Sequence, residues 1–368
     1  MTLGEGKDWQ AFANFLLVRY QRKRKHTRVL GHPYVLTLDP SSYCNLRCPF
    51  CPTGQRNQAR SYANVPLDRF KHLVDEVGRY LFYLDLFNWG EPFINKDLIP
   101  MIEYLRPFKF FSSVSTNFDI KMSEGLAERI VASGLSRLIV SADGATQESY
   151  MKYRVGGRLE NVLRNIKAVS AARQRAASPT PRIYWRFLVF RHNEHEIDRA
   201  KEMAEEMGVE LDLCAPYVDV QDERYRNWVS TIPTFNKYAT DAEGTPKHLK
   251  VGSVTKDGAC DWLWMSAAIN SNGSVSPCCG IWEEKRDFGK LGHDGFQGVW
   301  NNRTYQAARA FMRTGTPTAL DLICETCPVP DIWNYSSHYD PLILDSFYKR
   351  IPPLIRKSVE ALVRKILY

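Results

Sequence analysis

Between residues 34 and 215, short apolar runs alternate along the chain with segments that place apolar residues at helical spacing. The runs predict strands and the periodic segments predict helices. The predicted strands are Val35–Asp39, Leu81–Asn88, Phe111–Ser115, Leu138–Ala142, Ile183–Val189 and Val209–Cys214. The predicted helices are Pro66–Arg79, Asp97–Arg106, Ser123–Ser133, Leu159–Gln174 and Glu194–Glu206. Strands that alternate with helices predict an α/β fold, in which right-handed crossovers curl a parallel sheet into a barrel or partial barrel.

Residues 1–33 and 334–368 carry apolar side chains at helical spacing within basic sequence, and we expect an amphipathic helix at each end. The net charge of +8 is concentrated in these tracts, without any RNA-binding signature, so no nucleic-acid partner is expected. The favoured interpretation is two helices packed on the protein with a solvated basic rim. The alternative is contact with an anionic membrane surface or an anionic partner.

Composition places the chain among ordinary globular proteins. Its 368 residues, 44% hydrophobic and 24% charged, are enough for one large domain and a smaller one. No apolar run is long enough to span a bilayer and no signal peptide is recognisable, so we expect a cytoplasmic protein, peripheral at the membrane if the basic ends bind lipid. In a reducing compartment, nine cysteines indicate metal ligands rather than disulfides, particularly as eight of them fall in two groups.

The first group is Cys44, Cys48 and Cys51, spaced CxxxCxxC directly after the first predicted strand. Three thiolates can hold three irons of a cubane [4Fe–4S] cluster and leave the fourth iron open to another ligand. A zinc knuckle is the alternative, but zinc takes a fourth protein ligand at short range. The nearest histidines, His32 and His72, do not have a knuckle-like spacing, which favours the cluster.

This spacing, the aromatic Phe50 before the third cysteine and the position after the first strand resemble the signature of the radical S-adenosylmethionine (SAM) enzymes. The resemblance implies that the open iron chelates SAM and that one electron, from a reducing partner such as flavodoxin or ferredoxin, cleaves it to methionine and a 5′-deoxyadenosyl radical. It also implies a partial (βα)6 barrel over residues 34–215. Loops at the carboxyl ends of its strands then carry the chemistry.

The resemblance extends to the other strand ends. Asn88–Pro92 resembles the GGE-type motif of the family, with Trp89 in place of the first glycine, and implies that Gly90 and Glu91 contact the amino group of SAM. An ordinary turn is the alternative for the polar residues after the third strand. The remaining implied or candidate SAM contacts are Phe50, Ser115, Asn117, Ser141, Arg154 and Arg191.

The second cysteine group is Cys260, Cys278, Cys324 and Cys327, with Cys279 as a spare neighbour. Residues 270–275 predict a hairpin between two short strands that presents the first two thiols to one site. This layout resembles the twitch form of the SPASM domain, over residues 259–333, and implies a second, auxiliary [4Fe–4S] cluster. A zinc site with four cysteines is the alternative.

An auxiliary cluster can accept the electron that remains after a hydrogen atom has been removed and a base has taken the proton. The resemblance therefore implies a radical SAM oxidoreductase, acting on a sugar-like, cyclitol-like or other small substrate. A peptide is less favoured because only 34 residues precede the first strand. Peptide maturation and radical epimerisation are alternatives, and a non-catalytic metal-binding scaffold is an alternative of another class.

Candidate catalytic residues lie at two strand ends and in the second cysteine group. His192 and His195 are candidate proton acceptors, whereas Cys214 and Cys279 are the thiols that an epimerase needs as hydrogen-atom donors. Asn193 is expected to cap the following helix. Residues 216–258 form a loop-rich bridge whose aromatic side chains either close over the substrate or seal the barrel mouth. These side chains are Tyr217, Tyr225, Trp228, Phe235 and Tyr238.

Overall fold

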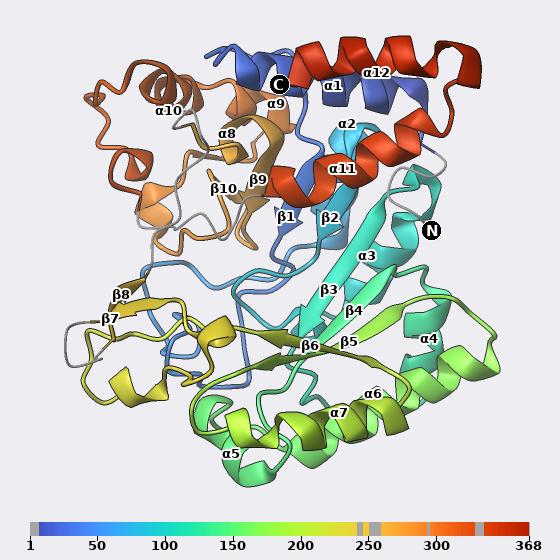
Figure 1. The fold of residues 1–368 in the computed structure, drawn as a ribbon, viewed down its shortest axis with the longest axis vertical. Coiled ribbons are helices and arrows are strands. Elements are labelled where there is room, and N and C mark those ends of the chain that lie inside the picture. Colours follow the sequence, from blue (N-terminus) through green and yellow to red (C-terminus); the bar gives the residue numbers. More distant parts are fainter. Residues whose placement is uncertain (1–6, 241–245, 250–258, 293–294, 328–334, 368) are drawn as a thin grey trace.

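A computed structural model describes residues 7–240, 246–249, 259–292, 295–327 and 335–367. Its centre is a sheet with the strand order β11-β10-β9-β1-β2-β3-β4-β5-β6 (Figure 1). Strands β1 to β6 are all parallel and follow one another in the order of the chain, as the alternating pattern predicts. They are Val35–Leu38, Tyr83–Asp85, Phe111–Thr116, Arg137–Ser141, Arg182–Leu188 and Glu210–Cys214. The sheet does not close on itself, so this part is a partial barrel.

All five predicted crossover helices are confirmed, with shorter bounds for most of them. They are α2 (Leu67–Val77), α3 (Leu98–Tyr104), α4 (Leu126–Ala132), α6 (Leu159–Arg175) and α7 (Ile197–Glu206). The expectation for β2 was wrong in length, because the chain leaves the sheet after Asp85 and forms the loop that carries Gly90. Within the barrel region, one helix, α5 (Gln147–Tyr153), was not predicted. Single 3-10 turns lie at Gly78–Tyr80, Pro92–Ile94, Arg106–Phe108 and Glu194–Glu196.

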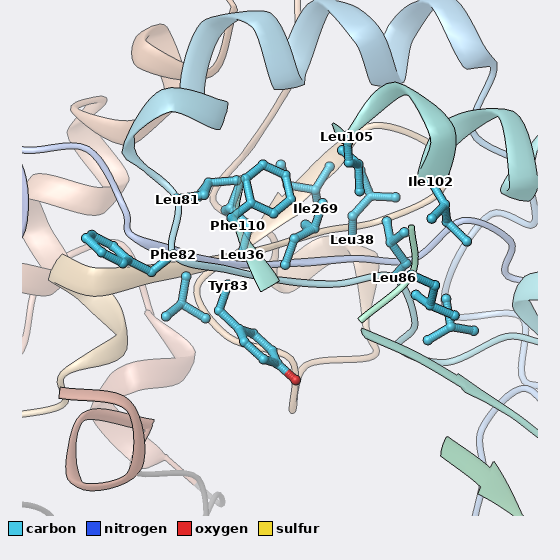
Figure 2. Close-up of a cluster of buried hydrophobic side chains, with 14 of the residues drawn as sticks. Leu36, Leu38, Leu81, Phe82, Tyr83, Leu86, Ile102, Leu105, Phe110 and Ile269 are labelled. Carbon is cyan, nitrogen blue, oxygen red and sulfur yellow. The ribbon is translucent and has the colours of Figure 1, made fainter. Parts of the chain in front are cut away.

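One face of the sheet packs against the helices in the apolar core, and the other face lines the interior of the partial barrel. Leu36 and Leu38 of β1 pack in one apolar cluster with Ile102 and Leu105 of the α3 region and with Ile269 of β9 (Figure 2). Successive side chains of a strand point to opposite faces. The residues between and after these leucines in β1 therefore face the interior of the partial barrel, away from the helices.

The C-terminal part adds its own strands to the same sheet. β9 (Ser266–Ile269) pairs in parallel with β1, and β10 (Ser274–Ser276) returns antiparallel to it. The predicted hairpin is confirmed, and its turn has Gly273 at a φ of +85°, which glycine adopts readily. The pairing of this hairpin with the barrel sheet was not predicted. The smaller elements of this part are β11 (Gly289–Lys290), α8 (Trp262–Met265), α9 (Gly295–Trp300), α10 (Arg303–Thr314) and a 3-10 turn at Ile323–Thr326.

The bridge between the barrel and the second cysteine group is described at residues 216–240 and 246–249. Its described elements are two 3-10 turns, Arg226–Trp228 and Pro233–Phe235, and the antiparallel pair β7 (Tyr238–Thr240) and β8 (Pro246–Leu249).

The first and last helices lie side by side on one side of the molecule, where α12 (Pro353–Leu367) packs along α1 (Trp9–Lys23) (Figure 1). One helix was expected at the C-terminal end, but there are two, α11 (Tyr335–Tyr348) and α12, because Pro352 and Pro353 interrupt the helix. None of the helices within the described ranges has both the length and the apolar character needed to cross a bilayer.

The basic residues of α1 do not form the expected solvated rim throughout. Arg22 pairs with Asp261, and Arg19 lies 2.9 Å from a carboxylate oxygen of Asp340. Asp340 also accepts a hydrogen bond from the Tyr34 hydroxyl at 2.7 Å. These buried pairs join the first helix to the C-terminal part of the chain.

Candidate active site at the barrel mouth

The first cysteine group lies in the loop after β1, where Cys48 is buried and Cys44 and Cys51 are half-buried. The amide of Asn117 donates to Cys44 Sγ at 3.6 Å, and an Arg154 nitrogen lies 3.9 Å from Cys48 Sγ. The loop folds back tightly on itself. A Cβ on Gly54 would lie 2.6 Å from the backbone nitrogen and oxygen of Cys48, so glycine is required there.

Burial raises the pKa of the Cys44 thiol to about 12 and that of Cys48 to about 11, and it also raises the pKa of Cys51. The thiols are therefore neutral at pH 7 until a metal displaces their protons. The Arg154 guanidinium opposes this shift at Cys48 by favouring the thiolate. Three thiols in one loop, with hydrogen-bond donors beside their sulfur atoms, fit an iron–sulfur cluster.

The loop after β2 approaches the cysteine loop closely. A Cβ on Gly90 would lie 1.7 Å from the carbonyl oxygen of Ser41, so any larger residue requires the backbone to move. The neighbouring Glu91 is buried, and its carboxylate accepts hydrogen bonds from Thr116 Oγ1 (2.6 Å) and the Asn117 N–H (2.7 Å). Glu91 thus ties the loop after β2 to the loop after β3. Its contact with SAM stays a prediction.

Arg154 lies beside the carboxyl end of β4. Its Nε donates to Asp143 Oδ2 at 2.6 Å, and the other oxygen of Asp143 accepts from the Leu188 N–H at 2.7 Å. At the same edge of the sheet, the hydroxyl oxygens of Ser115 and Ser141 are 3.5 Å apart. The structure therefore brings these predicted SAM contacts together around the cysteine loop, although no contact with SAM is tested.

Phe50 is the centre of an aromatic cluster that connects the cysteine loop to the bridge. Its ring centroid is 4.8 Å from that of Tyr225, 5.6 Å from Trp228 and 6.4 Å from Tyr217. Tyr153 packs against it from the barrel side at 5.7 Å. Three of the bridge aromatics therefore cover the cysteine loop, whereas the hydroxyl of Tyr238, a fourth, hydrogen-bonds the backbone of residue 218.

The candidate proton acceptors occupy different environments. His192 stacks on Phe190 with a centroid distance of 5.2 Å, and neither ring nitrogen has a hydrogen-bond partner. Burial lowers its pKa to about 4, so the ring is neutral at pH 7. His195 and Arg191, by contrast, have exposed side chains.

Asn193 stands at the N-cap position of the 3-10 turn Glu194–Glu196, as expected, but its side chain makes no capping hydrogen bond. Its side-chain amide donates to the carbonyl oxygens of Asp143 (3.0 Å) and Leu188 (2.9 Å), and its oxygen accepts from the Phe190 N–H. Asn193 thus fastens the ends of β4 and β5 together. The candidate thiol of Cys214, at the end of β6, lies 3.5 Å from Asp212 Oδ1, and burial raises its pKa.

Asp39 is a site residue that motif reasoning missed. It follows β1 on the interior face and is fully buried; its Oδ1 lies 3.4 Å from the Gly90 N–H and its Oδ2 has no hydrogen-bond partner. Burial raises its pKa to about 7. The only sequence signal is an acidic residue at the end of an apolar run, which turn chemistry also explains.

Three thiols of the second cysteine group are buried near one another, although the described residues contain no group of three His, Cys, Asp or Glu side chains already placed to hold a metal ion. Burial raises the pKa of Cys260 to about 12 and, more strongly, the pKa values of Cys278 and Cys324; these thiols further raise one another's pKa values. Cys327 is exposed at the end of the described segment. Several buried thiols that lie close enough to affect one another's pKa fit a polynuclear iron–sulfur site, since thiolate is the ligand that such clusters select.

A buried arginine connects the two cysteine-bearing regions. Arg60, which follows the first cysteine loop, donates to both carboxylate oxygens of Asp287 and to the carbonyl oxygen of Trp282 (2.8 Å). Cys279 lies at the same contact. With its amide oriented so that the oxygen accepts from Trp89 Nε1, Asn88 donates from its amide nitrogen to the Cys279 carbonyl oxygen at 3.2 Å. No pattern along the chain indicates this link.

Two family models match the chain. The model of the radical SAM superfamily matches residues 38–204, and that of the iron–sulfur cluster-binding domain called SPASM matches residues 260–328. The chain belongs to the radical SAM superfamily, in its SPASM/twitch group. Both domains are those of radical SAM enzymes, which favours a catalytic protein over the metal-binding scaffold. The cofactors of the chain are S-adenosylmethionine and iron–sulfur clusters, two [4Fe–4S] clusters being typical of these domains.

The chain is similar to curated proteins whose names denote different activities. The AdoMet-dependent heme synthase of Methanosarcina barkeri is 27% identical over 48% of each chain. Mycofactocin maturase MftC of Mycobacterium ulcerans is 26% identical over 50% of this chain and 47% of its own. The radical SAM enzyme thus spans about half the length of these relatives. A PqqA peptide cyclase of Xanthomonas campestris is 22% identical over 82% of this chain and 80% of its own.

The solved structure of Streptococcus suis SuiB bound to the precursor peptide SuiA matches this radical SAM enzyme with a TM-score of 0.55 and 15% identity, over 78% of this chain and 69% of that one. This likeness confirms the fold, a partial barrel followed by a SPASM-type domain.

Proposed function

We propose that this enzyme oxidises an unactivated C–H centre of a small polar substrate held in the interior of the partial barrel. The bound cofactors supply a 5′-deoxyadenosyl radical that removes the hydrogen atom and an auxiliary cluster that accepts the remaining electron. The protein must then hold the substrate and take one proton, which balances a dehydrogenation. Cys44, Cys48 and Cys51 hold the SAM-binding cluster in this proposal.

The observation that carries the substrate class is the polar interior face of the sheet. By the alternation along paired strands, Thr37, Asp39, Ser115, Ser141 and Arg186 fall on this face. The apolar Val35 and Ile139 share it, whereas Leu36, Leu38 and Val140 face the helices. Hydroxyl, carboxylate and guanidinium groups suit a substrate rich in hydroxyl or amino groups, such as a sugar or cyclitol.

We propose Asp39 as the group that takes the proton. Its unpartnered Oδ2 is at the carboxyl end of β1, the strand that leads into the cysteine loop. His192 is a weaker candidate. Its ring packs against Phe190 and Trp228, and burial lowers its pKa to about 4, so it is a poor base at neutral pH. An Asp39→Asn variant should still cleave SAM but release much less oxidised product.

A peptide substrate is the second candidate, and the names of the relatives favour it. Two of the matched relatives are a mycofactocin maturase and a PqqA peptide cyclase. In this alternative the hydrogen atom is removed from a peptide, and loss of one further electron and one proton leaves a new bond within the peptide instead of a double bond in a small molecule.

The test measures 5′-deoxyadenosine formed by the reduced, reconstituted enzyme with host extract separated into peptide, polar small-molecule and lipid fractions. We expect stimulation by the polar fraction, and none with a Cys48→Ala variant. Stimulation by peptides alone would overturn the substrate class but not the radical chemistry. SAM cleavage by the Cys48→Ala variant would overturn the assignment of the SAM-binding cluster.

A further inference from the structure

The last helix, α12, exposes apolar side chains on the face turned away from the protein. Leu354 is 96% exposed, Leu362 59% and Ile355 52%, whereas Val363 on the opposite face is 2% exposed. Residues 354 and 362 are two helical turns apart and 355 lies next to them on the same side. The three side chains therefore form one ridge along the outside of the helix, which we call the α12 ridge.

The α12 ridge is bordered by cations. Lys357, Arg364 and Lys365 are exposed on the same helix. Lys23 and Arg24, at the end of α1, are also exposed, and Lys23 donates to the backbone oxygen of Lys365 at 2.9 Å. At the opposite end of the pair, Arg350 just before α12 donates to the backbone oxygen of Lys7 just before α1. The helices thus run side by side in the same direction, and their basic carboxyl ends meet.

This arrangement has the charge and shape of an interfacial helix. Long lysine and arginine side chains can reach the headgroups while leucine and isoleucine enter the acyl boundary. The only acidic residue of α12, Glu360, is half-buried at the flank of the helix and not on the ridge. Five exposed cations around a narrow apolar ridge match a negatively charged lipid surface better than they match a second copy of this chain, which carries the same positive charge.

We propose that the α12 ridge docks the enzyme on an anionic lipid bilayer, with α12 lying in the plane of the interface. The helix does not need to unfold or leave α1, because its buried face already packs on the protein. This docking is separate from the proposed substrate class and applies whether the enzyme modifies a small molecule or a peptide.

The experiment is co-sedimentation of the full, anaerobically reconstituted enzyme with vesicles. We expect binding to vesicles of phosphatidylglycerol and phosphatidylcholine, little binding to phosphatidylcholine alone, and release at high salt. A Leu354→Gln/Leu362→Gln variant should lose about tenfold in partitioning, and a Lys357→Gln/Arg364→Gln variant should bind anionic vesicles about as weakly as neutral ones. Met151→Gln, which changes an exposed apolar residue on α5, should bind as the wild type does.

Three outcomes would overturn the proposal. They are absence of binding to any vesicle, equal binding to neutral and anionic vesicles, and a lipid-free dimer that the Leu354→Gln/Leu362→Gln variant abolishes. Normal 5′-deoxyadenosine formation by the variants would show that any loss of binding is not caused by unfolding.

Discussion

Arg60 and Asp287 form a buried, two-pronged ion pair across the contact between the first cysteine loop and the C-terminal iron–sulfur domain, with nitrogen–oxygen distances of 2.7 and 2.9 Å. The Arg60 side chain has no solvent exposure, and Asp287 is almost buried. A parallel pair of N–H···O bonds fixes direction as well as distance, so this contact orients one cofactor-binding region against the other.

Loss of one partner of this ion pair should be costly. We expect Arg60→Met to reduce the free energy of unfolding by about 3 to 5 kcal/mol, because Asp287 is left buried and unpaired. The double change Arg60→Met/Asp287→Leu should recover part of that loss. Arg182→Met is the control, since its pair with Glu210 is exposed and is worth about 0 to 1 kcal/mol. Anaerobic denaturant unfolding measures all three, and equal losses for Arg60→Met and Arg182→Met would contradict the prediction.

Arg154 should be sensitive even to a conservative change. Lysine has one point charge and cannot keep both the bond to Asp143 and the contact with Cys48, so we expect Arg154→Lys to lower the rate of 5′-deoxyadenosine formation at least about tenfold. Arg158→Lys, an exposed residue nearby, is the matched control. Wild-type rates for Arg154→Lys would show that neither contact matters for SAM cleavage.

Gly90 is expected to tolerate no side chain. A methyl group there would overlap the Ser41 carbonyl oxygen, so the loop after β2 must move away from the cysteine loop. We expect Gly90→Ala to lower both the bound iron per chain and the rate of SAM cleavage. Gly292→Ala is the control, because its Cβ would meet no atom closer than 4.0 Å. Full iron content in the Gly90→Ala protein would refute the prediction.

Asp39 should make stability depend on pH. Its pKa rises from 3.8 in the unfolded chain to about 7 in the folded protein, so the folded state binds the extra proton between these values. The contribution of Asp39 to the free energy of unfolding is therefore most favourable below about pH 4. It decreases as the pH rises towards 7, by a few kcal/mol at most. The Asp39→Asn protein should therefore be more stable than the wild type at pH 8, and by a smaller margin at pH 5.5. A margin that does not change with pH would count against the raised pKa.

Removal of an auxiliary thiol should separate SAM cleavage from product formation. We expect Cys324→Ala to keep SAM binding and to form 5′-deoxyadenosine, but to release about tenfold less oxidised product or none, because the second electron has no acceptor. Simultaneous measurement of 5′-deoxyadenosine and product gives the coupling ratio. An unchanged ratio would remove the second cysteine group from the mechanism.

Local patterns account for much of the fold and for the cysteine groups. The six barrel strands, their helices and the hairpin were predictable because periodicity and turn chemistry act within a few residues. Arg60 and Asp39 were not predictable, since an arginine 227 positions from its partner and a buried carboxylate look like ordinary surface residues in a single sequence. The end of β2 was not predictable either, because Leu86 and Phe87 continue the apolar run although the strand ends at Asp85.

The parallel ladder between β1 and β9 has a consequence for the placement of the two cysteine groups. Four residue pairs, from Val35↔Ser266 to Leu38↔Ile269, fix the hairpin of the second iron–sulfur region beside the strand that leads into the first. A slip by one residue would displace that hairpin by about 3.3 Å and turn its side chains over. Because β1 leads into the first cysteine group and β9 into the hairpin before Cys278, the register of this one strand pair helps to set the spacing between the two cysteine groups.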